Sequence, residues 1–124
     1  GANVHLTGRV SDSELRWLYA NSAGLVSASY EDFGLTPVEA AMFGKPAALL
    51  RAGGFLDTMI EGVNGVFFDE PRPKAITAAV QQLTGERWSD DAIVRSAERY
   101  SEQGFAARLR CIADETARYH RSAA

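Results

Sequence analysis

The sequence has very little cysteine or histidine and no long apolar run. Cys111 is the only cysteine among 124 residues, so the chain can form neither an internal disulfide nor a thiolate metal cluster. No stretch approaches the roughly twenty apolar residues of a membrane-spanning helix. His5 and His120 have neither metal-ligand spacing nor a linked acid and nucleophile. We therefore expect no metal or other cofactor, and a cytoplasmic protein.

Basic residues are also in the minority. Thirteen Lys and Arg face sixteen Asp and Glu, which gives a formal net charge of −3 and argues against nucleic acid or anionic lipid as a partner. The hydrophobic content of 46% and the charged content of 23% are those of an ordinary globular domain. We expect a single domain over residues 1–124, with a helical tail from about residue 86.

Two common phosphate-binding motifs are missing. A Walker loop would need a glycine five residues before Gly44 and a hydroxyl residue after Lys45, but the chain has Glu39 and Pro46 at those positions. No GxGxxG sequence occurs either. If the chain binds a phosphate, it uses another arrangement.

Short apolar runs alternate with segments of helical periodicity. The strands that we predict are Val4–Thr7, Gly24–Ser29, Pro46–Leu50 and Val66–Phe68. The first predicted helix begins at a capping box, Ser11 to Glu14. A helix is also predicted after each later strand, and the chain beyond residue 74 is predicted to be helical. Leu15, Leu18 and Tyr19 form a stripe expected to pack on the sheet. The predicted fold class is α/β, a parallel sheet with helices on both faces.

The segment from Glu31 to Glu39 is the most informative part of the chain. An apolar strand precedes it, and Thr36-Pro37 suggests a helix with Thr36 as N-cap and Pro37 at the first helical position. The amides of that first turn would face Gly34 and Glu31 with partial positive charge, which favours a bound diphosphate. Gly34 would let a ligand approach the backbone closely. The two glutamates would accept hydroxyl hydrogen bonds at opposite ends of a nucleotide sugar.

Simpler interpretations of the same residues stay open at this point. Thr36 and Glu39 have the spacing of a capping box, in which Glu39 would only bind the Thr36 amide. Glu31 could be an ordinary loop acid. Gly53-Gly54 is either a plain loop after a strand or a place where the backbone has a functional role.

An ordered set of motifs resembles one known family. The motifs are Val4-His5-Leu6-Thr7-Gly8-Arg9-Val10, Glu31-x7-Glu39, Ala40-Ala41-Met42-Phe43-Gly44-Lys45-Pro46, Gly53-Gly54 and Gly62-Val63-Asn64-Gly65-Val66-Phe67-Phe68. Together they resemble the C-terminal half of the retaining nucleotide-sugar glycosyltransferases of the two-domain GT-B type, family 4. The resemblance covers about residues 4–84. It implies part of a Rossmann-like donor-binding domain that lacks its first strands.

The resemblance also implies roles for residues of the central segment. Glu31 would be the catalytic residue, in contact with the donor sugar near the reacting centre. The amides of Phe33, Gly34 and Leu35 would contact sugar hydroxyls and phosphate. Thr36 would help to hold the diphosphate.

Three further residues receive donor-binding roles in the same way. Glu39 would accept hydrogen bonds from the ribose hydroxyls, and Arg9 and Val10 would lie beside the nucleobase. In one place the chain departs from the family, because Asp57 stands where a glutamate usually follows the Gly-Gly pair. The shorter side chain puts the sugar specificity in doubt.

The family's other components are not found in this sequence. The resemblance implies an N-terminal domain that carries the acceptor site, and basic residues that clamp the diphosphate from earlier strands. We therefore expect the chain to be part of a longer protein, inactive as 124 residues alone, with peripheral membrane association only through absent parts. Either Val4–Thr7 pairs with Gly24–Ser29, or another chain fills the gap in the sheet, for example in a homodimer with exchanged elements.

The resemblance implies transfer of a hexose with retention of configuration and without an obligatory metal. The donor is expected to be GDP-mannose, with UDP-glucose as the second choice. Two alternatives remain at this stage: a nucleotide-binding module without catalytic activity, and a sugar-nucleotide epimerase of the same fold.

Overall fold

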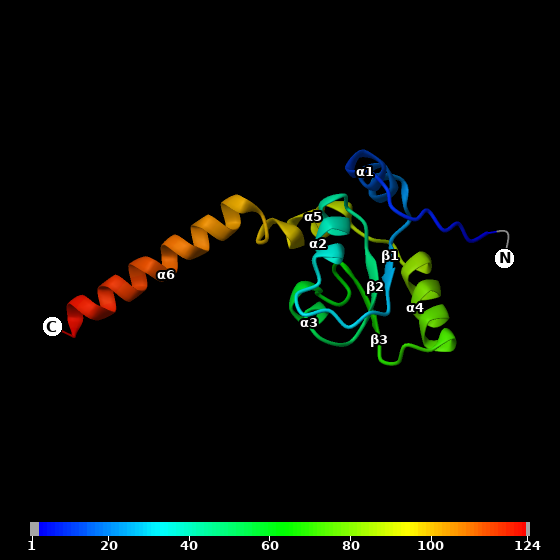
Figure 1. The fold of residues 1–124 in the computed structure, drawn as a ribbon. Coiled ribbons are helices and arrows are strands. Elements are labelled where there is room, and N and C mark those ends of the chain that lie inside the picture. Colours follow the sequence, from blue (N-terminus) through cyan, green and yellow to red (C-terminus); the bar gives the residue numbers. More distant parts are fainter. Residues whose placement is uncertain (1–2, 124) are drawn as a thin grey trace.

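The centre of the protein is a three-stranded parallel sheet. The computed structural model describes residues 3–123. Strands β1 (Leu25–Ser27), β2 (Ala47–Leu50) and β3 (Gly65–Phe68) lie side by side in chain order, with Ala48 of β2 between Val26 and Val66 in the register (Figure 1). The predicted α/β class and the parallel sheet are confirmed.

Residues 3–123 form six helices in the predicted order. They are α1 (Asp12–Asn21), α2 (Leu35–Met42), α3 (Phe55–Thr58), α4 (Pro73–Gly85), α5 (Asp90–Glu98) and α6 (Glu102–Ser122). The capping box at the start of α1 is confirmed, because the Ser11 hydroxyl accepts from the Glu14 amide and the Glu14 carboxylate accepts from the Ser11 amide. Each helix between two strands is a crossover that keeps the strands parallel.

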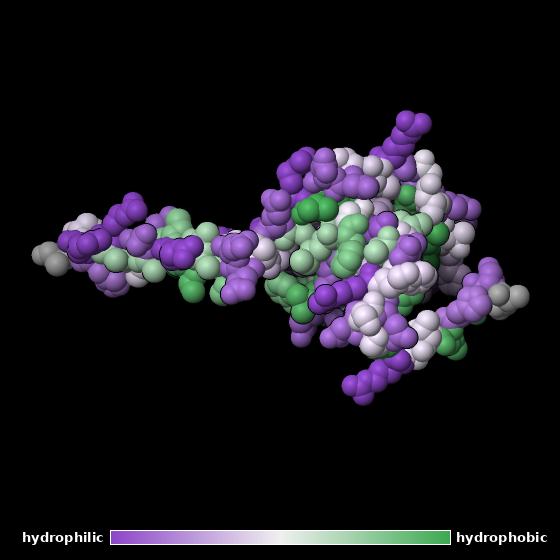
Figure 2. Space-filling view, turned by 90° about the horizontal axis from the view of Figure 1, so that it is seen from above, coloured by the Kyte–Doolittle hydropathy of each residue, from purple (hydrophilic) through white to green (hydrophobic). Residues whose placement is uncertain are grey.

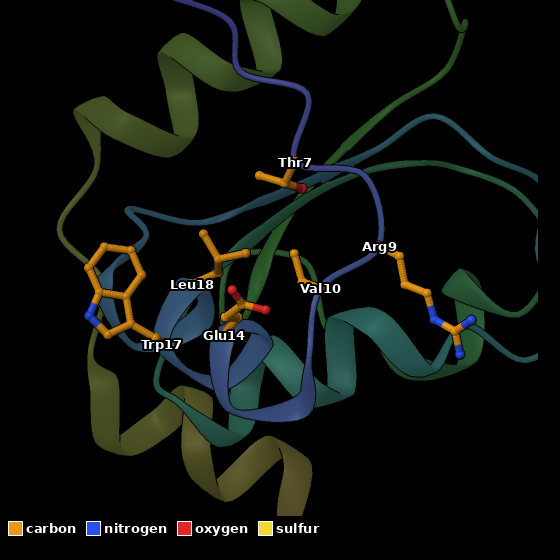
Figure 3. A pocket seen from close by; sticks show the side chains of 6 residues that line it. All are labelled: Thr7, Arg9, Val10, Glu14, Trp17 and Leu18. Atoms are coloured by element: carbon orange, nitrogen blue, oxygen red, sulfur yellow. The ribbon is translucent and has the colours of Figure 1, made fainter.

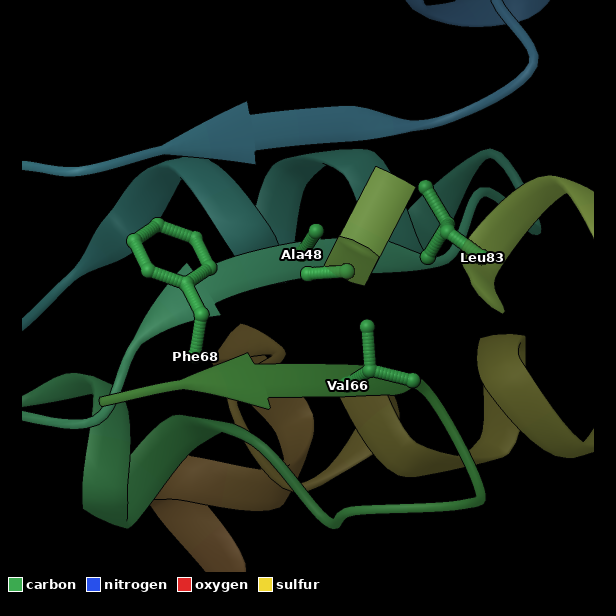
Figure 4. Close-up of a cluster of buried hydrophobic side chains, with 5 residues drawn as sticks. Ala48, Val66, Phe68 and Leu83 are labelled. Atoms are coloured by element: carbon green, nitrogen blue, oxygen red, sulfur yellow. The ribbon is translucent and has the colours of Figure 1, made fainter. Parts of the chain in front are cut away.

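The two faces of the sheet are covered by different helices. On one face Ala48, Val66 and Phe68 pack against Ala79 and Leu83 of α4 (Figure 4). On the other face Ala47 and Leu49 pack against Phe55 of α3 and Met59 just after it. Because both faces of β2 and β3 are covered, these two strands are apolar at successive positions and do not alternate with polar residues.

A third cluster joins two helices away from the sheet. Val38 and Ala41 of α2 pack against Ile93 and Ala97 of α5, and Ile93 is fully buried. The chain after residue 86 is therefore more than a tail, since α5 belongs to the core. In contrast, α6 has no buried residue and extends away from the sheet, with hydrophobic side chains among polar ones along it (Figures 1 and 2).

The predicted strand Val4–Thr7 is wrong. These residues are irregular, with Val4 64% and Leu6 96% exposed, and they do not pair with β1. A strand forms only where a neighbour supplies hydrogen-bond partners, and two apolar side chains do not fix one by themselves. The far edge of β1 therefore has no partner strand within residues 3–123. Filling of that edge by a second chain stays a prediction.

The apolar stripe of α1 packs less closely than predicted. Leu15 and Leu18 remain 39% and 37% exposed, and α1 has no buried residue. Tyr19 does pack, but its ring stacks on Phe43 at the end of α2. The stripe is thus part of a helix-to-helix contact and not of the sheet core.

Candidate functional site

The central candidate segment is the loop between β1 and α2. It leaves the sheet at the carboxyl end of β1, the edge where ligands bind in open parallel sheets. Glu31 lies on this loop with an exposed side chain, and its Oε1 accepts a 2.9 Å hydrogen bond from the Ser29 hydroxyl. Ser29 is in turn 2.8 Å from the Ser27 hydroxyl. A row of hydroxyls thus leads from the strand end to a solvent-accessible carboxylate.

The Gly53-Gly54 pair after β2 supports this loop. The Gly54 amide donates a 2.7 Å hydrogen bond to the Glu31 carbonyl. A Cβ at Gly53 would lie 2.3 Å from the Glu31 carbonyl oxygen, and one at Gly54 would lie 2.4 Å from the backbone of Asp32 and Phe33. No side chain fits at either position, because backbone atoms cannot move aside cheaply. Gly53-Gly54 is thus a loop after a strand whose backbone packs against the Glu31 loop, and a functional role of its backbone stays a prediction.

The start of α2 differs from the prediction. The helix begins at Leu35, with Gly34 as N-cap in the left-handed region at φ 80°, so Thr36 and Pro37 are its second and third residues. No side chain caps this end, and the predicted Thr36 N-cap is wrong. The turn is made by glycine because a positive φ is strained for other residues. The first amides of α2 are therefore left without a side-chain partner.

The surroundings of Gly34 differ from the prediction, while a donor-binding role of its amide stays a prediction. It is buried, and a Cβ there would lie 2.5 Å from the ring of Phe55. The space beside its Cα is thus occupied by the protein core, not held open for a ligand. The neighbouring Leu35 and Thr36 are exposed.

Glu39 lies one turn into α2 and makes no capping contact. Its Oε2 accepts a 2.9 Å hydrogen bond from the Tyr19 hydroxyl of α1. The capping-box interpretation is therefore wrong, since Glu39 is directed to α1 and not back to Thr36. Burial, the hydrogen bond to Glu39 and the charge of Glu39 together raise the pKa of Tyr19 to about 12.

A cavity of about 560 Å³ lies between α1 and α2. We call it the Glu39 cavity, and its lining residues are Asp12, Leu15, Arg16, Tyr19, Glu39, Met42 and Phe43. Glu39 is half-buried at its wall. The cavity combines aromatic rings, a cation and carboxylates, the types of group that hold a nucleoside.

Arg9 and Val10 line a separate cavity of about 370 Å³ that we call the Arg9 cavity (Figure 3). Thr7, Glu14, Trp17 and Leu18 complete its lining, and Figure 3 shows the Arg9 side chain directed away from Trp17. Neither Glu31 nor Glu39 lines it. The structure thus places Arg9 and Val10 beside α1, without bringing them into one cavity with the two glutamates.

Phe33 and Leu35 line a third, apolar groove of about 550 Å³. Its other residues come from the start of α6 and the segment before it: Arg99, Tyr100, Ser101, Glu102, Phe105, Arg108, Leu109 and Ile112. Phe33 contacts Tyr100 edge to face, with ring centroids 5.9 Å apart. The arginines of this groove were not predicted from the sequence, because only the tertiary fold brings the chain near residue 100 back to the loop.

Tyr100 and Arg99 also fix the position of α3. The Tyr100 hydroxyl donates a 2.8 Å hydrogen bond to the Asp57 carbonyl, and the Arg99 guanidinium donates to the same oxygen. The Asp57 side chain itself is exposed. Asp57 therefore lies on a short helix whose backbone is bound by Arg99 and Tyr100, and its carboxylate is in solvent.

The described residues contain neither a group of metal-ligating side chains nor a membrane-spanning helix. Within residues 3–123 no three His, Cys, Asp or Glu side chains are grouped as metal ligands. None of the helices described is long and apolar enough to cross a bilayer.

Comparison with known proteins gives a family match over most of the chain. The model of the family described as glycosyl transferases group 1 matches residues 1–105. The match includes every predicted site residue and ends near the start of α6.

Individual relatives are similar over 78 to 109 residues. A sucrose synthase from Acidithiobacillus caldus is 38% identical over 95 residues, which cover 69% of this chain and 12% of that protein. D-rhamnosyltransferase WbpZ from Pseudomonas aeruginosa is 32% identical over 109 residues, covering 85% of this chain and 29% of that protein. Alpha-1,3/1,6-mannosyltransferase ALG2 from Dictyostelium discoideum is 30% identical over 78 residues, which cover 62% of this chain and 18% of that protein. The chain thus spans less than a third of each of these relatives.

Proposed function

The chain belongs to the group 1 glycosyl transferases, and on this premise we propose that it is the donor-binding half of a retaining hexosyltransferase. The donor is a nucleoside diphosphate hexose, with GDP-mannose as first choice and UDP-glucose as second. The names of the three relatives, a mannosyltransferase, a rhamnosyltransferase and a sucrose synthase, support sugar transfer as the activity. The acceptor binds to a further domain outside these 124 residues.

One observation carries the proposal. At the carboxyl edge of the sheet an exposed carboxylate, Glu31, is followed by an uncapped helix start, and a second carboxylate, Glu39, lies one turn further on a cavity wall. A diphosphate bound to the amides of Leu35 and Thr36 would have one glutamate on either side. The sugar would extend toward Glu31, and the ribose toward Glu39.

The chemistry follows from these positions. The diphosphate that leaves the sugar gains negative charge, and the free amides at the start of α2 stabilise that charge without moving. Phe33 and Gly34 contribute amides from the preceding loop. Glu31 accepts from the sugar hydroxyls and stabilises positive charge at the anomeric carbon in the transition state.

Arg9 and Val10 remain in the proposal as contacts of the nucleobase. The Arg9 cavity and the Glu39 cavity both border α1, since Glu14 and Leu18 line one and Leu15 and Tyr19 line the other. A nucleoside that reaches from one cavity to the other would pass across α1.

A thermal-shift experiment with nucleotides tests the proposal. A nucleoside diphosphate at roughly 100 times its Kd should stabilise the chain by about 2.7 kcal/mol, seen as a rise in Tm. Glu39→Ala should remove most of this rise, and Glu98→Ala, which changes an exposed glutamate on α5, should keep it. If neither GDP nor UDP raises the Tm of the parent chain, the proposed function is wrong.

The role of Glu31 needs a second measurement. Glu31→Gln should still bind the nucleoside diphosphate, because Glu31 faces the sugar. In the complete polypeptide the same variant should lose most of the hexose transfer. Normal transfer by the variant would remove Glu31 from the reacting centre.

A further inference from the structure

Tyr19 and Glu39 form a contact between two helices twenty residues apart in the sequence. The Tyr19 hydroxyl of α1 donates a 2.9 Å hydrogen bond to Oε2 of Glu39 on α2. Within the described residues this is the one hydrogen bond made by the Glu39 side chain. The orientation of the Glu39 carboxylate is therefore set by α1 and not by its own helix.

The ring of Tyr19 is itself held in place by α2. It stacks on Phe43 with ring centroids 5.7 Å apart and planes 19° from parallel. Glu39 and Phe43 are four residues apart and so lie on the same face of the helix. Tyr19 thus spans one turn of α2, with its ring on Phe43 and its hydroxyl on Glu39.

The environment keeps this hydroxyl a donor. Burial first, and then the hydrogen bond to Glu39 and the charge of Glu39, raise the pKa of Tyr19 to about 12, so the phenol stays protonated throughout the neutral range. A protonated phenol beside a carboxylate has one polar role, which is to donate. The hydroxyl occupies one acceptor site of Oε2 and leaves the rest of the carboxylate available.

A ribose diol needs two acceptor sites in fixed positions. A free glutamate side chain would lose its rotamer freedom when it binds the diol, which weakens binding. A carboxylate already held by a hydrogen bond has lost that freedom beforehand. Tyr19 borders the same cavity as Glu39, so it holds the carboxylate at the place where a ligand would meet it.

We propose that Tyr19 is a positioning residue that orients the Glu39 carboxylate toward the ribose hydroxyls of the nucleotide. The proposal rests on the proposed function, in which Glu39 is the ribose ligand. It goes further by assigning selectivity for ribose to a tyrosine on a different helix. The Tyr19 hydroxyl acts on the ribose through the Glu39 carboxylate.

A purely structural role for the contact gives a different expectation. If Tyr19 only joined α1 to α2, its loss would lower the stability and weaken all ligands by a similar factor. A positioning role weakens ligands that carry the ribose hydroxyls and spares those that lack them. The ratio of two affinities separates the two roles.

The experiment compares ribose and 2′-deoxyribose nucleotides. It uses the full chain, with any flanking polypeptide it natively carries, and measures the Kd of GDP, of UDP and of their 2′-deoxy forms by calorimetry. Tyr19→Phe keeps the ring and its stack on Phe43 but removes the hydroxyl. Tyr119→Phe, an exposed tyrosine on α6, is the matched control.

For the parent chain we expect tighter binding of the ribose form. In Tyr19→Phe the ribose form should bind roughly threefold to tenfold more weakly, as for the loss of one hydrogen bond, while the 2′-deoxy form changes by less than about twofold. Tyr119→Phe should match the parent. An unchanged preference for ribose in Tyr19→Phe, or equal weakening of both forms, overturns the proposal.

Failure of the proposed function looks different. In that case the parent chain binds neither GDP nor UDP, or binds them without preference for ribose. If Tyr19→Phe does not fold, Phe43→Leu gives the same test, since it removes the ring beneath Tyr19 and leaves both polar groups. We expect it to reduce the ribose preference as well, and an unchanged preference there also overturns the proposal.

Discussion

The Gly54 amide donates a 2.7 Å hydrogen bond to the Glu31 carbonyl, and this contact joins the loops that follow β1 and β2. Both loops leave the same edge of the sheet because the strands are parallel. The loop with the proposed catalytic carboxylate is thus held by backbone contacts, while its side chain stays exposed. Glycine is required at the second loop because the two backbones nearly touch.

We predict that Gly54→Ala lowers the free energy of unfolding by about 1–3 kcal/mol or more, as overpacking does elsewhere. The added Cβ would meet the backbone of Asp32 and Phe33 at 2.4 Å. Denaturant titration measures the change. Gly85→Ala is the control, because nothing lies within 4 Å of its Cβ position. Equal stability of the two variants would contradict the close contact.

Tyr19 should change the stability at high pH. The folded chain holds the Tyr19 proton up to a pH of about 12, whereas the usual pKa of a tyrosine, which applies in the unfolded chain, is 10.0. The group therefore stabilises the fold below pH 10, and this contribution is lost as the pH rises from 10 to about 12. Ultraviolet titration of the parent chain should show one more tyrosine that ionises near pH 12 than the titration of Tyr19→Phe does. A difference centred near pH 10 would mean that Tyr19 is not paired with Glu39.

Asn64 should be important for stability although it lies outside the site. It is buried, its Oδ1 accepts a 2.7 Å hydrogen bond from the Ile60 amide, and its Nδ2 donates to the Ser96 hydroxyl at 3.0 Å. We expect Asn64→Ala to cost about 1–3 kcal/mol, since buried groups would lose their partners. Asn21→Ala, an exposed position on α1, is the comparison and should stay within about 0.5 kcal/mol. Chemical denaturation measures the unfolding free energy of both variants, and an equally small loss for Asn64→Ala would contradict the prediction.

A substitution in the segment before α1 should have little effect on stability, because this segment is exposed. Leu6 is 96% exposed, so Leu6→Ser should change the unfolding free energy of the 124-residue chain by less than about 0.5 kcal/mol. Leu49→Ala, at a fully buried position in β2, should cost about 2–5 kcal/mol. A large cost for Leu6→Ser would indicate that this segment is buried, for example in an exchanged dimer.

Local sequence patterns were sufficient for most elements. The short apolar runs around Val26, Ala48 and Val66 form strands as predicted, and Ser11 with Glu14 starts α1 by a capping box. The start of α2 was misplaced by two residues. A threonine before a proline is a good helix start, but the chain had already turned at Gly34.

The sequence by itself determined the α/β class, the parallel strands, the family and the segment that holds the two glutamates, because these depend on residue type and spacing along the chain. Tertiary structure decided what each site residue contacts. It joined Gly54 to the Glu31 loop, directed Glu39 to Tyr19 in place of Thr36, and left Val4–Thr7 outside the sheet. Such contacts join residues far apart in the chain, and the periodicity of the local sequence does not predict which distant residues a side chain will contact.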